Sequence, residues 1–193
     1  MPFLRVKKVP RRQSSHKYEY VYEVENYREG NKIKQKTLRF LGRLVELNEL
    51  AGSNQNIEDL EELEGISDKE RLIEHLATVI LSAHGFKKSK KGFVKNKILI
   101  DLKNYSVKLN NRNVFIKLND GYFGKYTLEK LREARSYEEL IRWLVASGLV
   151  PKPKKFDESD PNFVFLTKLA ALFKDKIKIK TISFEEFAKK VGY

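Results

Sequence analysis

The chain has 193 residues and no cysteine, and its 39 Lys and Arg against 26 Asp and Glu give a formal net charge of +13. This length suits one medium domain or two small ones, and 41% hydrophobic residues are enough for a packed core. The lack of cysteine excludes disulfides, thiol catalysis and thiolate metal sites.

Composition also predicts the compartment. The sequence has no apolar run long enough to cross a bilayer, and its beginning, MPFLRVKKVPRRQ, lacks the apolar centre of a secretory signal. We therefore expect a cytoplasmic protein with no membrane partner. One Met and 34% charged residues are thermophile-like features.

The charges fall into blocks of opposite sign. Residues 1–43 hold 12 Lys or Arg against 4 acids, residues 46–74 hold 2 against 10, and residues 75–126 hold 11 against 2. Clustered positive charge is what a polyanion-binding surface needs, because each neutralised phosphate releases condensed counterions. We expect a nucleic acid as the partner; the alternative is a merely solvated, Lys-rich surface.

Residues 18–42, YEYVYEVENYREGNKIKQKTLRFLG, predict a basic β-hairpin. Two runs rich in Tyr, Val, Ile and Thr flank the turn residues Arg28 to Asn31. Five Lys or Arg lie in this stretch. The tyrosines would add base stacking if the target were single-stranded.

The hairpin resembles the signature that opens many prokaryotic insertion-sequence transposases of the IS4 and IS1634 type. The matching residues are Glu25, Tyr27-Arg28-Glu29-Gly30, Lys32, Gln35 and Leu41-Gly42. The resemblance implies DNA-associated biology in a mobile element or virus, with the hairpin as an accessory module. It does not imply the enzyme, because the family's large acidic catalytic domain needs far more chain than follows here.

Three S-x-x-E capping boxes predict helix starts, because the serine caps a backbone N–H while the glutamate reaches back to the serine. They are Ser67 with Glu70, Ser136 with Glu139, and Ser183 with Glu186. The expected helices are 68–84, ending at Gly85, 137–147, ending at Gly148, and 184–190. Apolar spacing predicts a further helix at 161–173, and Thr127 is expected to cap a short one through Ala134.

Between the first two long helices the sequence predicts strands. KILIDL at 97–102, YSVKLN at 105–110 and VFIKLN at 114–119 are separated by turn residues and predict an antiparallel meander, which Asp120-Gly121 closes. The stretch PKPKKFDESDP at 151–161 is typical of a linker or exposed loop.

A degenerate or active metal-dependent nuclease of the PD-(D/E)xK type is one alternative. In this chain a helix, Asp101, Lys117 and a second helix follow one another in an order that resembles this nuclease fold. However, Phe115 stands where the fold requires a metal-binding carboxylate. If Asp101-Leu102-Lys103 served as the acid-x-Lys element, Glu74 would be the only further carboxylate candidate. The plainer interpretation makes Asp101 a turn residue and Lys117 a solvent-facing strand residue.

Two binding folds and an adaptor are also compatible with parts of the sequence. A double-stranded-RNA-binding domain lacks support because Thr127-Leu128-Glu129-Lys130 is nearly neutral where that fold has a basic helix start. A winged helix would use residues 127–150 for its helices and begin its wing at PKPKK. Arg142 would then contact bases in the groove, whereas Trp143 is more readily explained as a core residue. An adaptor would dock a basic partner on the acidic segment 58–64.

We therefore predict an α+β protein with an N-terminal β-hairpin, a helix–three-stranded meander–helix core and a C-terminal helix, strand and helix. The expected organisation is a basic hairpin module at 1–45, an acidic connector at 46–66, a core at 67–150 and a linker with a helical extension at 151–193. We expect a non-enzymatic nucleic-acid-binding protein, DNA more than RNA, with no metal and no cofactor. The candidate phosphate contacts are Arg11, Arg12, Lys17, Arg28, Lys32, Lys34, Lys36, Arg39, Lys87, Lys88, Lys90 and Lys91.

Overall fold

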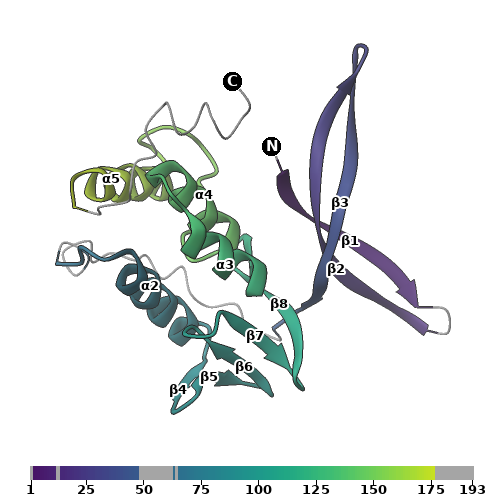
Figure 1. The fold of residues 1–193 in the computed structure, drawn as a ribbon, viewed down its shortest axis with the longest axis horizontal. Coiled ribbons are helices and arrows are strands. Elements are labelled where there is room, and N and C mark those ends of the chain that lie inside the picture. The colour runs from purple at the N-terminus through teal and green to yellow at the C-terminus, as the bar shows by residue number, and fades with distance from the viewer. Residues whose placement is uncertain (1, 12–13, 48–62, 64, 177–193) are drawn as a thin grey trace.

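The computed structural model describes residues 2–11, 14–47, 63 and 65–176. The described part is an α+β structure, as predicted, in which a long β-ribbon projects from a body of helices and short strands (Figure 1). The helix expected at 184–190 and most of the acidic connector lie outside the described residues.

The ribbon consists of three antiparallel strands: β1 (Pro2–Arg11), β2 (Ser14–Glu29) and β3 (Lys32–Val45). The predicted hairpin is confirmed: Glu29 pairs with Lys32 across a two-residue turn in which Gly30 has a φ of 59°. That backbone conformation favours glycine. The sequence did not predict β1, because its charged residues and Pro10 interrupt the apolar alternation of a strand.

The ribbon is continuous with the sheet of the body. The last residues of β3 run parallel to β8 (Arg112–Leu118), with Arg43 opposite Val114 and Val45 opposite Ile116. The nine-stranded sheet of the described residues has the order β1-β2-β3-β8-β7-β6-β5-β4, and β9 also pairs with β8. Its remaining strands are β4 (Lys87–Ser89), β5 (Gly92–Lys95), β6 (Ile98–Asp101), β7 (Ser106–Leu109) and β9 (Gly121–Gly124).

The predicted meander is confirmed in β6, β7 and β8 but is longer than expected. Asp120-Gly121 does not close it, because β9 follows and pairs with β8. A hairpin of β4 and β5 also forms where a basic loop was expected. The sequence did not predict these strands because Lys87, Lys88, Lys90 and Lys91 interrupt the apolar pattern of a strand. The hairpin requires glycine at position 92, where an added Cβ would lie 2.0 Å from the Ile100 carbonyl oxygen.

In the described residues four helices form: α2 (Lys69–Ala83), α3 (Lys125–Glu133), α4 (Tyr137–Ser147) and α5 (Pro161–Lys176). The cap of α4 is as predicted, with Ser136 accepting a hydrogen bond from the Glu139 N–H. One predicted cap is wrong. Asp68, not Ser67, caps α2. Helix α3 begins at Lys125 with Gly124 as its N-cap, and Thr127 helps to cap it from inside the helix by accepting a hydrogen bond from the Gly124 N–H.

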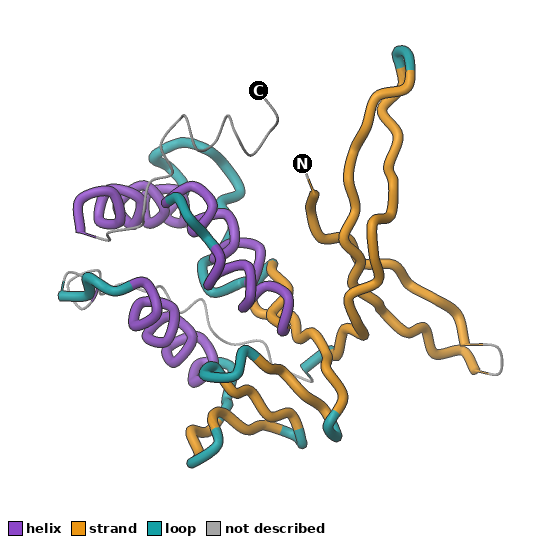
Figure 2. Tube along the Cα trace, viewed as in Figure 1, coloured by secondary structure: helices purple, strands orange, loops and turns teal. Residues whose placement is uncertain are grey.

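The hydrophobic core lies between the helices and the short strands of the body. It includes Leu76 of α2, Ile116 of β8, Phe123 of β9, Leu128 of α3 and Leu144 of α4, each no more than 1% exposed. The helices lie together on one side of the ribbon, which extends away from them in two directions (Figure 2). This arrangement leaves much of the ribbon accessible.

The segment between α4 and α5 is a loop built on Asp160. The Asp160 carboxylate accepts hydrogen bonds from the backbone N–H groups of Lys154 (2.5 Å), Lys155 (2.9 Å) and Asn162 (2.9 Å). Residues 151–160 contain no strand in the structure. The expectation of an exposed loop is confirmed, and the wing required by the winged-helix alternative does not form there.

Candidate nucleic-acid interface

The ribbon has a free two-stranded end. Strand β1 pairs with β2 only as far as Pro2 opposite Glu25, so beyond that pair only β2 and β3 continue, to the Gly30-Asn31 turn. We call residues 26–35 the arm. The arm projects from the body, and the pair Arg11 and Ser14 of β1 and β2 lies near the opposite end of the ribbon (Figure 1).

The arm and its base bring four predicted site residues together. Arg28 lies opposite Ile33, and Lys32, Lys34 and Lys36 all point to the other face of the hairpin, opposite Glu29, Tyr27 and Glu25. All four basic side chains are exposed. Lys34 forms an ion pair with Glu29, and their side chains are 50% and 60% exposed. An ion pair this exposed adds little stability and opens readily for another anion.

Arg39, a further predicted contact, is engaged with the body. Its Nε donates to the Glu23 carboxylate at 2.6 Å, and its guanidinium lies 4.7 Å from the centre of the Tyr126 ring. The Tyr126 hydroxyl donates to the other oxygen of Glu23, also at 2.6 Å. We call Glu23, Arg39 and Tyr126 the anchor, because it joins the ribbon to α3.

The anchor shifts two pKa values. Burial would raise the pKa of Glu23, but hydrogen bonds from Tyr126 and Arg39 outweigh it and hold the pKa below its usual 4.5. Burial and the hydrogen bond to Glu23 raise the pKa of Tyr126 to about 12. Glu23 is therefore a carboxylate and Tyr126 a neutral donor near neutral pH, which is the state the anchor needs.

The remaining predicted residues lie in two other places. Arg11 and Lys17 belong to β1 and β2 near the end opposite the arm, and Arg12 lies outside the described residues. Lys87, Lys88, Lys90 and Lys91 are exposed on the β4–β5 hairpin. Because β4 and β1 are the two edges of the sheet, the structure does not bring this basic cluster beside the ribbon.

Sequence reasoning missed three further basic residues on the ribbon. Arg5 lies opposite Tyr22, and Lys7 and Arg43 lie on either side of Tyr20. All three side chains are exposed. Arg5 and Lys7 were missed with strand β1 itself. The alternation of Tyr18, Tyr20 and Tyr22 was the signal that could have located this surface, because alternate strand residues share a face.

Trp143 packs in the core, as predicted. It is 7% exposed, and its ring meets that of Tyr126 edge-on at 5.7 Å. The Arg142 guanidinium lies 5.0 Å from the centre of the Trp143 ring. Trp143 therefore packs against the Tyr126 ring of the anchor.

The residues of the nuclease alternative do not form a catalytic cluster. The Asp101 carboxylate accepts hydrogen bonds from the Asn104 side-chain amide and from the backbone N–H groups of Asn104 and Lys103, which lower its pKa. Asp101 is thus a turn residue, and Lys117 is exposed on β8. In the part of the chain that the structure describes, no three His, Asp or Glu residues are placed to hold a metal ion.

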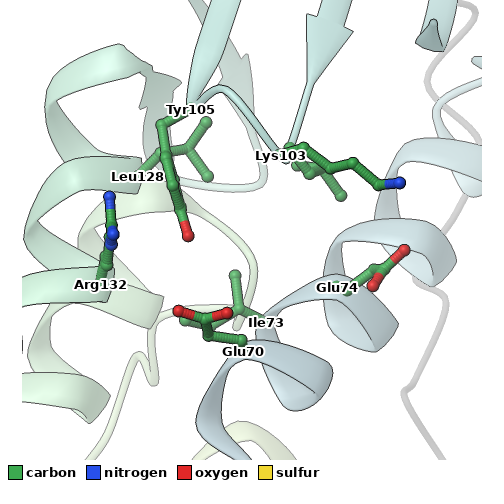
Figure 3. A pocket seen from close by; sticks show the side chains of 8 residues that line it. Glu70, Ile73, Glu74, Lys103, Tyr105, Leu128 and Arg132 are labelled. Atoms are coloured by element: carbon green, nitrogen blue, oxygen red, sulfur yellow. The ribbon is translucent and has the colours of Figure 1, made fainter.

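Glu74 lines a small pocket between α2, α3 and the β6–β7 turn (Figure 3). The pocket has a volume of about 100 Å³, and Asp101 is not among its lining residues. Its walls carry two carboxylates and two cations beside Tyr105, whose ring centre lies 5.1 Å from the Arg132 guanidinium. The charged lining residues are Glu70, Glu74, Lys103 and Arg132.

Among the described residues, no helix has the length and apolar character required to cross a membrane. The geometry thus defines an α+β protein with a projecting basic β-ribbon. Residues 6–83 match the N-terminal domain of the IS1634 family of transposases. The expected resemblance is therefore confirmed, and it extends from the ribbon to the end of α2. No curated protein and no solved structure matches the chain.

Proposed function

We propose that this is a non-enzymatic nucleic-acid-binding protein of a mobile element, with DNA preferred over RNA. The observation that carries the proposal is the arm, which presents exposed Lys and Arg side chains beyond the body. The match to a transposase N-terminal domain supports DNA as the partner, since transposases act on DNA. Phosphates are contacted by the basic residues of the ribbon and, at the opposite edge of the sheet, by the lysines of the β4–β5 hairpin.

The shape of the arm favours duplex DNA over duplex RNA. The major groove of B-form DNA is about 12 Å wide and admits a two-stranded β-ribbon, whereas that of A-form RNA is deep and narrow. The arm consists of the two paired strands β2 and β3, which a groove of this width admits. The exposed Arg28, Lys32 and Lys34 then lie near the phosphates that border it.

The test compares two variants with the same reduction of charge. Lys32→Gln, Lys34→Gln and Lys36→Gln neutralise the arm and its base, and the control variant carries Lys117→Gln, Lys152→Gln and Lys168→Gln, at exposed positions of the body. Fluorescence anisotropy measures their affinity for duplex and single-stranded DNA and RNA of one length.

We expect the wild type to prefer DNA, and the ribbon variant to bind duplex DNA at least tenfold more weakly than the control variant does. A phosphate that no lysine neutralises keeps its condensed counterions, so their release no longer favours binding. Equal affinities of the two variants would overturn the assignment of the arm, and a wild type that binds no nucleic acid would overturn the function.

A further inference from the structure

The two faces of the ribbon differ in charge. One face, which we call the aromatic face, carries Arg5, Lys7, Tyr18, Tyr20, Tyr22, Phe40 and Arg43, as the strand register shows. The other face carries the four glutamates of β2 and includes the Glu23 anchor to α3. Among the described ribbon residues, none on the aromatic face is acidic.

The aromatic face has two rows that cross the ribbon from strand to strand. In the first row Tyr20 lies between Lys7 and Arg43, and in the second Tyr22 lies between Arg5 and Phe40. A bulge in β3 beside Leu41 places Phe40 and Arg43 on the same face although they are three residues apart. Each row therefore places at least one cation beside a ring at the spacing of neighbouring strands.

Ring contacts join the two rows into one surface. The centre of the Phe40 ring lies 5.6 Å from that of Tyr20 and 5.5 Å from that of Tyr22. The Lys7 ammonium lies 4.9 Å from the centre of the Tyr22 ring, and the Arg43 guanidinium 4.5 Å from that of Tyr18. Phe40 is nevertheless 58% exposed. A large apolar ring this exposed, on a face whose charged residues are all cations, suits a flat apolar ligand that carries negative charge.

We propose that the aromatic face binds unstacked bases of single-stranded DNA, with Phe40 and Tyr20 as stacking platforms and Arg5, Lys7 and Arg43 as phosphate contacts. The inference rests on the proposed function and deepens it, because it assigns a second ligand state to the ribbon. Rings beside a basic track are the common design of surfaces that bind single strands without sequence preference. The lack of acids selects a polyanion over a neutral apolar partner.

The test replaces the rings and keeps the charges. The variant Tyr20→Leu, Phe40→Leu is compared with Phe156→Leu, which removes an exposed ring from the loop before α5, away from the ribbon. Fluorescence anisotropy measures binding to a single-stranded DNA and to a duplex of the same length. A second variant, Lys7→Gln with Arg43→Gln, keeps the rings and removes two exposed cations, so that the test does not depend on how well the ring variant folds.

We expect the ring variant to bind the single strand roughly tenfold more weakly while its affinity for the duplex stays within about twofold. The second variant should bind the single strand more weakly by a similar factor, and Phe156→Leu should change neither affinity. Unchanged single-strand binding in both variants of the aromatic face would overturn the inference, even if the duplex is still bound. If the wild type binds neither DNA, the proposed function itself fails.

The competing occupant is a second copy of the chain. Light scattering coupled to size exclusion decides this point without DNA. A monomer is the expected result. A dimer of the wild type that Phe40→Ser converts to a monomer would overturn the inference, because the rings would then be covered by the partner copy.

Discussion

At the residue scale, the anchor fixes how the ribbon meets the body. Glu23 accepts from both Arg39 and Tyr126, and Trp143 packs against the Tyr126 ring. These four residues are far apart in the sequence, and none of them belongs to a local motif that would predict the contact. The anchor could not be predicted because a long-range pairing of one carboxylate leaves no local pattern.

Tyr126→Phe removes the hydroxyl donor and leaves the ring in place. We expect the free energy of unfolding to fall by about 1 to 2 kcal/mol, since the hydrogen bond to a partly exposed carboxylate is removed. Chemical denaturation measures the change. Tyr27→Phe on the exposed arm is the control and should stay within about 0.5 kcal/mol of the wild type. Equal effects of the two variants would show that the anchor contributes nothing.

The anchor also predicts a dependence on pH. The pKa of Glu23 is lower in the folded chain than its usual 4.5, so its contribution to stability is complete above pH 4.5 and is lost as the pH falls through the folded pKa. The wild type should therefore exceed Glu23→Gln in stability near neutral pH, with the gap closing in acid. Denaturation at a series of pH values checks this, and a gap that stays constant into acid would contradict it.

At the element scale, local signals predicted most of the body and only part of the ribbon. The cap at Ser136, the stop at Gly148 and the alternation of β6 to β8 have physical causes within a few residues, and they appear as expected. Strands β1 and β4 were missed because lysines fill positions where an apolar side chain would mark a strand. Pairing with β2 and β5, a tertiary effect, overrides their weak local preference.

Strand β9 and helix α4 meet at a backbone contact that only glycine permits. A Cβ at Gly121 would lie 2.1 Å from the Gly148 nitrogen, whereas one at Gly65 would meet nothing within 4 Å. We expect Gly121→Ala to lower the free energy of unfolding by about 2 kcal/mol or more, because backbone must move. Gly65→Ala is the matched control and should change it by less than about 0.5 kcal/mol. Thermal or chemical denaturation that ranks the two alike would refute this packing.

At the scale of the whole molecule, the two basic clusters lie at opposite edges of one sheet. For a flat sheet with strands about 4.8 Å apart, β4 lies roughly 34 Å from β1 and roughly 24 Å from β3, which carries the arm lysines. Both distances exceed the length of about six base pairs of DNA. The charge blocks of the sequence predicted both clusters. Their separation could not be predicted, because it depends on β3 joining β8, a pairing between distant parts of the chain.

The separation makes the contribution of the β4–β5 hairpin depend on the length of the DNA. Neutralising Lys87, Lys88, Lys90 and Lys91 to Gln should weaken binding to a duplex of about 30 base pairs and leave binding to one of about 6 base pairs nearly unchanged, since the shorter duplex cannot span both clusters. Anisotropy on the two duplexes measures this. An equal reduction on both would mean that the hairpin and the ribbon contact the same short stretch.

The most direct test of the account is the salt dependence of duplex binding by the wild type and by the variant with Gln at positions 32, 34 and 36. Each phosphate contact contributes about 0.9 to the slope of log affinity against log salt concentration. The account predicts a steep slope for the wild type and a slope smaller by up to about 2.7 for the variant. A wild type that binds no DNA at low salt, or two identical slopes, would contradict it.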